Sequence, residues 1–85
     1  MSFKKTSKAC TRKARIDMDI IERLDQERGE LEYRINRLAL FLHEQEKTQT
    51  VSDEQIDLLY RQRLFMQGYK NILDLRINDL EEHHD

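Results

Sequence analysis

The chain has 85 residues with no proline and a single cysteine, and its net charge is only −2. This length supports at most one domain, and one cysteine excludes a disulfide framework within the chain. The sequence also predicts neither a transmembrane helix nor a signal peptide, because no apolar run approaches roughly 20 residues and no apolar block follows the first residues.

Charge is spread unevenly along the chain. Six of the 15 basic residues and none of the 17 acidic residues lie in residues 1–15, so the remainder carries a net charge of −8. We interpret residues 1–15 as a basic N-terminal arm that attracts anions. A solvated tail that only aids solubility is the alternative.

Residues 16–46 have the apolar spacing of a long first helix. From Ile21 to Leu42 the apolar residues recur in steps of three and four, with one interruption at Arg28. This spacing predicts a single apolar stripe on one side of an α-helix. Leu40 and Phe41 extend beyond that stripe, which indicates either crowding near the turn or contact with another subunit.

Residues 53–80 are predicted to form a second helix. Ser52 is a favourable N-cap and Gln55 completes a capping box, and the acids Asp53 and Glu54 suit the positive end of the helix dipole. One apolar row is predicted to face the first helix, and it consists of Leu59, Met66, Leu73 and Leu80. A neighbouring row consists of Leu58, Phe65 and Ile72.

These elements predict an all-α fold, a long antiparallel helical hairpin over residues 16–81 followed by a tail over residues 82–85. The second helix is apolar on more than one side, so the hairpin cannot cover it alone, and we expect a homo-oligomer. A fold-back at Thr48–Gln49 would place Arg28 level with Tyr69. Arg28 then either extends out along its stem to solvent or supplies charge to a ligand or a subunit contact.

The same fold-back at Thr48–Gln49 would also place two glycines, Gly29 and Gly68, level with each other across the hairpin. Glycine inside a helix costs about 1 kcal/mol relative to alanine. A pair at one level therefore suggests a close backbone approach or room for another group, with coincidence as the alternative.

The sequence contains no arrangement typical of catalysis or of a metal site. It lacks a Ser/His/Asp order and a glycine-rich phosphate loop, and its carboxylates belong to solvated helix faces, so we expect no enzyme. His43 stands alone, and the adjacent His83 and His84 near the end lack the geometry of a metal site. We expect no metal and no cofactor.

The order of residues in both helices resembles a known family. The resemblance lies in Leu31-Glu-Tyr-Arg-Ile-Asn-Arg-Leu38, Phe41-Leu42, Leu58-Leu59-Tyr-Arg-Gln62, Phe65-Met66, Tyr69, Ile72-Leu73 and Arg76-Ile77. Together these resemble the hairpin domain of small bacteriophage proteins that counter the CBASS and Thoeris immune systems. The resemblance covers about residues 20–78.

This resemblance implies a non-enzymatic sponge for cyclic nucleotides that acts in the cytoplasm of the bacterial host and serves immune evasion. The ligands implied are cyclic dinucleotides such as cGAMP, cyclic trinucleotides, or cyclic ADP-ribose isomers, held between the subunits of a homohexamer. A helical adaptor for a protein partner is the alternative. A nucleic-acid-binding dimer is a weaker one, because the acidic body opposes a long polyanion.

In some relatives, an aromatic residue before the first long helix stacks on a base and a lysine in that helix meets phosphate. Here Asp25 stands at the lysine's position, and no aromatic residue lies between residues 4 and 32. The resemblance therefore implies stacking by Phe3 if the arm folds over. The basic candidates for ligand binding are Arg12, Lys13, Arg23 and Arg28, with Lys70 as the candidate for a second pocket.

Overall fold

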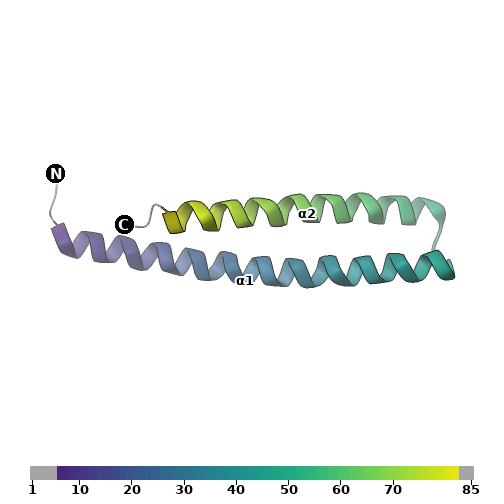
Figure 1. Cartoon of the computed structure of the whole chain (residues 1–85), viewed down its shortest axis with the longest axis horizontal. Coiled ribbons are helices and arrows are strands. Elements are labelled where there is room, and N and C mark those ends of the chain that lie inside the picture. Colours follow the sequence, from purple (N-terminus) through teal and green to yellow (C-terminus); the bar gives the residue numbers. More distant parts are fainter. Residues whose placement is uncertain (1–5, 83–85) are drawn as a thin grey trace.

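Two antiparallel helices make up the described part of the chain. The computed structural model describes the backbone of residues 6–82 and the side chains of residues 18–82. Helix α1 spans Thr6–Lys47 and helix α2 spans Asp53–Glu82, and they lie side by side in a rod of 64 × 16 × 15 Å (Figure 1). No strand occurs within residues 6–82. The predicted all-α hairpin is confirmed.

Helix α1 begins at Thr6, whereas the apolar periodicity predicted a start at about residue 16. The intervening segment is rich in alanine, lysine and arginine and has no proline, so its backbone favours a helix even without an apolar stripe. Because α1 has 42 residues and α2 only 30, the first turns of α1 extend past the end of α2 (Figure 1). Most of the segment interpreted as an arm is therefore helical backbone.

The hairpin core is one seam of side chains between the helices. Leu73 of α2 is fully buried at its centre. The other buried members of this core are Leu24, Leu31 and Ile35 of α1 and Ile77 of α2, and Met66 and Leu80 pack against them. Steps of three and four along both helices are the spacing of a coiled-coil seam. The predicted pairing of one apolar stripe on each helix is therefore confirmed.

The turn between the helices is held by one buried amide. Gln45 is only 7% exposed. Its Nε2 donates to Thr50 Oγ1 at 2.8 Å, and its Oε1 accepts hydrogen bonds from the backbone N–H groups of Thr50 at 2.7 Å and Val51 at 3.3 Å. The Gln45 side chain thus satisfies loop groups that would otherwise lack partners at the end of the core.

Ser52 caps α2 as the sequence predicts. The backbone N–H of Gln55 donates to Ser52 Oγ at 3.1 Å, and the N–H of Ile56 donates to the Ser52 carbonyl at 3.0 Å. Asp53 and Glu54 occupy the first turn, where negative charge is favoured. This cap defines where α2 begins.

The register of the hairpin differs from the expected one. Arg28 was expected to lie level with Tyr69, but it pairs with Asp74 instead. Tyr69 borders a groove on another side of α2. The turn extends from Thr48 to Ser52, so the chain folds back later than Thr48–Gln49 and the partner in α2 moves towards its C-terminus.

The two glycines do not bring the helices together. Gly29 and Gly68 are both exposed, and a Cβ atom added at either position meets no atom within 4 Å. A close approach between α1 and α2 at these residues was a wrong expectation. A contact with a ligand or a second subunit there stays a prediction.

We expect Leu73→Ala to destabilise the hairpin severely. Truncating a fully buried leucine typically costs about 2–5 kcal/mol, and a thin two-helix core has few other contacts to compensate. Urea denaturation followed by circular dichroism measures this loss. Leu64→Ala, at a leucine that is 69% exposed on the same helix, is the matched control and should change stability by less than about 0.5 kcal/mol. Equal losses in both variants would contradict the assigned seam.

Candidate functional site

The sequence-predicted ligand residues fall into three groups. Phe3 lies outside the described residues, and the side chains of Arg12 and Lys13 do too, although the backbone of both belongs to α1. Arg23 is exposed on α1. Among the candidates whose side chains are described, Arg28 and Lys70 were predicted for separate contacts, and the structure brings these two together.

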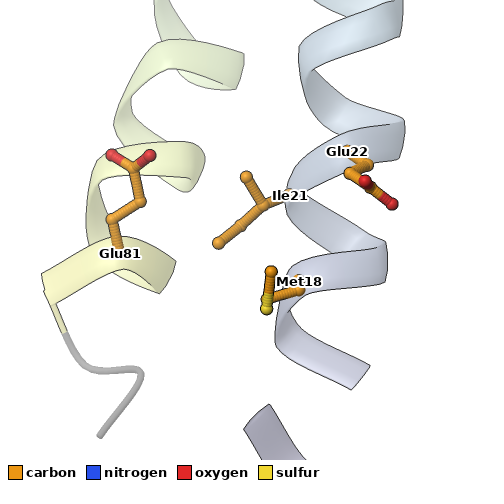
Figure 2. A pocket seen from close by; sticks show the side chains of 4 residues that line it. All are labelled: Met18, Ile21, Glu22 and Glu81. Atoms are coloured by element: carbon orange, nitrogen blue, oxygen red, sulfur yellow. The ribbon is translucent and has the colours of Figure 1, made fainter. Parts of the chain in front are cut away.

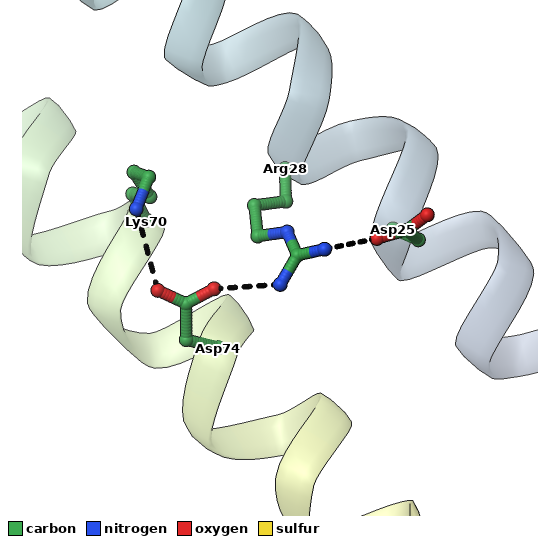
Figure 3. Close-up of polar contacts among 4 residues, drawn as sticks. All are labelled: Asp25, Arg28, Lys70 and Asp74. Carbon is green, nitrogen blue, oxygen red and sulfur yellow. Dashed lines mark hydrogen bonds and ion pairs between the residues drawn. The ribbon is translucent and has the colours of Figure 1, made fainter.

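Arg28 and Lys70 meet at one carboxylate of α2, Asp74 (Figure 3). Arg28 Nη1 donates to Asp74 Oδ1 at 3.0 Å, and Lys70 Nζ lies 3.4 Å from Asp74 Oδ2. The other guanidinium nitrogen, Nη2, donates to Asp25, which lies one turn earlier on α1. Two cations and two carboxylates therefore form one bridge across the helices.

The charges in this bridge reinforce one another. The hydrogen bond from Arg28 lowers the pKa of Asp74, and Lys70 lowers it further, while partial desolvation acts in the opposite direction. The hydrogen bond to Asp74 in turn raises the pKa of Arg28. The formal charges of two cations and two carboxylates cancel, so the bridge is neutral as a whole, and Arg28 is already paired within its own chain.

Sequence reasoning missed the role of Asp25 and Asp74. The signal was present, because an arginine at a seam position requires an opposite charge within reach. Asp25 lies three residues before Arg28, which places both on one face of α1. Asp74 follows Lys70 by four residues, but its partner across the hairpin could be identified only with the correct register.

A polar cleft lies between the helices beside Lys70. It is lined by Glu32, Ile35 and Asn36 of α1 and by Gln67, Lys70 and Asn71 of α2. Three amide side chains supply both donors and acceptors, which suits the edge of a nucleobase. An ammonium group has three donors, so Lys70 can meet an anion while it keeps its contact with Asp74. This is the described hollow that best combines recognition of a base with a positive charge.

A second hollow lies at the open end of the hairpin (Figure 2). Met18 and Ile21 of α1 form its apolar part, and the carboxylates of Glu22 and Glu81 border it. The last turn of α2 contains no basic residue. No basic residue is among the described side chains that line this hollow, and its two carboxylates repel phosphate, so as described it does not suit an anionic ligand.

An apolar row of α2 lies in solvent beside the seam. Leu58, Phe65 and Ile72 are spaced seven residues apart, and Phe65 is 74% exposed. Leu58 and Phe65, together with Tyr69, border a shallow groove on α2. The expectation that α2 carries more apolar surface than the hairpin covers is confirmed. Exposed apolar rows of this kind are typical of interaction sites in other proteins.

The described residues contain neither a candidate metal site nor a helix that could span a membrane. No group of three or more metal-capable side chains occurs among the residues whose side chains are described, and His83 and His84 lie outside them. His43 is exposed, with its Nδ1 3.7 Å from Glu46 Oε1. Neither α1 nor α2, as far as each is described, is apolar enough over a sufficient length to cross a membrane.

Comparison with protein families identifies a match over most of the hairpin. A family model described as Sequestin matches residues 18–79, which include the seam, the turn and nearly all of α2. The comparisons with curated proteins and with solved structures find no significant match.

We expect Asp74→Asn to lower the thermal stability at neutral pH and to flatten its dependence on pH. Because the folded pKa of Asp74 is lowered, its ionised form stabilises the fold above the unfolded pKa of about 3.9. This contribution is lost as the pH falls through the folded pKa. Melting temperatures at fixed protein concentration between about pH 6 and 2 measure the effect.

Asp57→Asn is the matched control, since it removes an exposed carboxylate that pairs with Arg61 at 2.8 Å on the same helix. It does not touch the bridge between α1 and α2. If both variants lost the same stability over the same pH range, the bridge would not be the source of the acid sensitivity.

Proposed function

The chain belongs to the Sequestin family, and we propose that it sequesters cyclic oligonucleotide immune signals without cleaving them. The ligand class is cyclic dinucleotides such as cGAMP, with cyclic trinucleotides as further ligands. The protein would act in the cytoplasm of the bacterial host of a phage and thereby evade CBASS-type defence. The family match over residues 18–79 is the observation that carries this proposal, because the family name denotes sequestration.

The chemistry of the Lys70 cleft supports a nucleotide as the ligand. A cyclic dinucleotide carries two phosphates and two bases, so it requires both cations and groups that read base edges. Lys70 supplies a charge, and Asn36, Gln67 and Asn71 supply amide groups. Asp74 holds the lysine in place, which reduces the entropy lost when a ligand binds.

The shape of the hairpin supports binding between copies. A rod only 16 × 15 Å in cross-section cannot enclose a drug-sized ligand, whereas binding sites usually bury most of the ligand surface. The exposed apolar row of α2 gives the chain a reason to associate. We therefore propose a homo-oligomer, in line with the hexamers that the resemblance implies, in which neighbouring copies close the cleft.

A helical adaptor for a protein partner is the second candidate function. The same apolar row favours it, because Leu58, Phe65 and Ile72 also suit a groove on another protein. An adaptor requires neither self-association nor nucleotide binding, so one measurement separates the two functions. A nucleic-acid-binding dimer is weaker, since residues 16–85 carry a net charge of −8.

Native mass spectrometry and calorimetry with a panel of cyclic di- and trinucleotides test the proposed function. We expect an oligomer that binds at least one of them with a submicromolar dissociation constant. The bound nucleotide should be recovered intact after denaturation of the protein. Recovery of a hydrolysed product would indicate an enzyme, and a monomer that binds no nucleotide would favour the adaptor.

Lys70→Gln should weaken binding of the cyclic dinucleotide by roughly 10- to 100-fold, because a hydrogen bond to a charged group contributes about 1.5–3 kcal/mol. Lys47→Gln removes an exposed lysine at the end of α1, far along the chain from the cleft, and is expected to leave the affinity unchanged. Titration calorimetry measures both variants. Equal affinities would place the ligand elsewhere in the assembly.

A further inference from the structure

The outer row of α2 is arranged symmetrically about Phe65. Positions four, seven and eleven residues away on either side share its face, because these steps come closest to whole turns of 3.6 residues. The pairs at these steps are Arg61 and Tyr69, Leu58 and Ile72, and Glu54 and Arg76. Each of these seven side chains is exposed in the hairpin.

This order makes the row complementary to itself when it is reversed. If two copies of α2 pack antiparallel with Phe65 opposite Phe65, each Leu58 meets an Ile72 and each Glu54 meets an Arg76. Arg61 of one copy then lies over Tyr69 of the other, which is the geometry of a cation–π contact. An apolar centre with opposite charges at both ends is what an isologous two-fold interface requires.

We propose that α2 packs antiparallel against α2 of a second copy of this chain, on a two-fold axis at Phe65. This inference rests on the homo-oligomer of the proposed function and specifies its first interface. The contact runs from Glu54 to Arg76, about 33 Å of helix.

The charges select a second copy over an unrelated partner. Glu54 and Arg76 have no ion-pair partner among the described residues of the hairpin, and they stand at equal distances from Phe65. Reversal of the helix brings each beside its opposite, and this happens twice in one interface. Gly68 lies beside the row and has open space around it, which leaves room for Gln62 of the second copy.

A single-cysteine variant tests the axis directly. Cys10→Ser together with Phe65→Cys leaves one thiol, and only a two-fold axis at residue 65 places two such thiols together. Antiparallel helices whose axes lie 8–10 Å apart bring facing Cα atoms to about 5 Å, which is within the range of a disulfide. We expect most of the protein to form a disulfide-linked dimer on mild oxidation without any nucleotide.

The matched control is Cys10→Ser with Leu64→Cys. Residue 64 is as exposed as residue 65 but points about 100° away around the helix. This control variant should remain monomeric on a non-reducing gel. Equal cross-linking at both positions would reflect random collision and would overturn the proposed axis.

Charge reversal tests the register while Phe65 is kept. Glu54→Arg or Arg76→Glu alone places like charges together twice and should raise the dimer dissociation constant about tenfold. The double variant exchanges the signs and should restore wild-type association, as measured by analytical ultracentrifugation. Single variants without effect, or a double variant without rescue, would overturn the register.

These outcomes are distinguishable from failure of the proposed function. Nucleotide binding that persists without a disulfide at residue 65 would overturn this interface alone. A cross-linked dimer that binds no cyclic nucleotide would support the interface and overturn sequestration. Both measurements use the full chain.

Discussion

In a hairpin of two helices, each helix can bury only the stripe that faces the other. On α1 this stripe is largely buried, because Leu24, Leu31 and Ile35 lie in the seam with α2. On α2 the seam uses Leu73 and its neighbours, and the row centred on Phe65 remains in solvent. Because α2 leaves more apolar surface uncovered than α1 does along this seam, it is the element through which we propose that one hairpin contacts the next.

The ion-pair bridge contributes orientation more than stability. Replacing paired charges in a seam with apolar residues is often neutral or stabilising. The Arg28–Asp74 pair therefore adds little to the free energy of unfolding compared with an apolar pair. They do specify one register, because Arg28 meets Asp74 at a single offset of the two helices. The same carboxylate holds Lys70 at the edge of the polar cleft, so the contact that sets the register also positions a cation.

The sequence predicted those features that depend on local chemistry. The cap at Ser52 and the apolar row through Leu73 follow from side-chain type and spacing alone, and both are confirmed. The register could not be predicted in the same way, because it depends on how the turn uses its residues. Gln45 holds Thr50 and Val51 in a wider turn than a fold-back at Thr48–Gln49 would give. As a result, Arg28 meets Asp74 and does not lie level with Tyr69.

Assembly and ligand binding are coupled if the ligand contacts two copies at once. A molecule that binds the assembled state and not the separate chain stabilises assembly by mass action. For a sponge this coupling is useful, because a hairpin that is incomplete alone gains both its partner and its ligand in one equilibrium. The α2 interface and the Lys70 cleft lie on different sides of the same helix, since the seam residues separate Lys70 from the row of Phe65. One pair of hairpins therefore still presents its clefts outward, so closing them requires further copies, which a dimer through α2 alone does not supply.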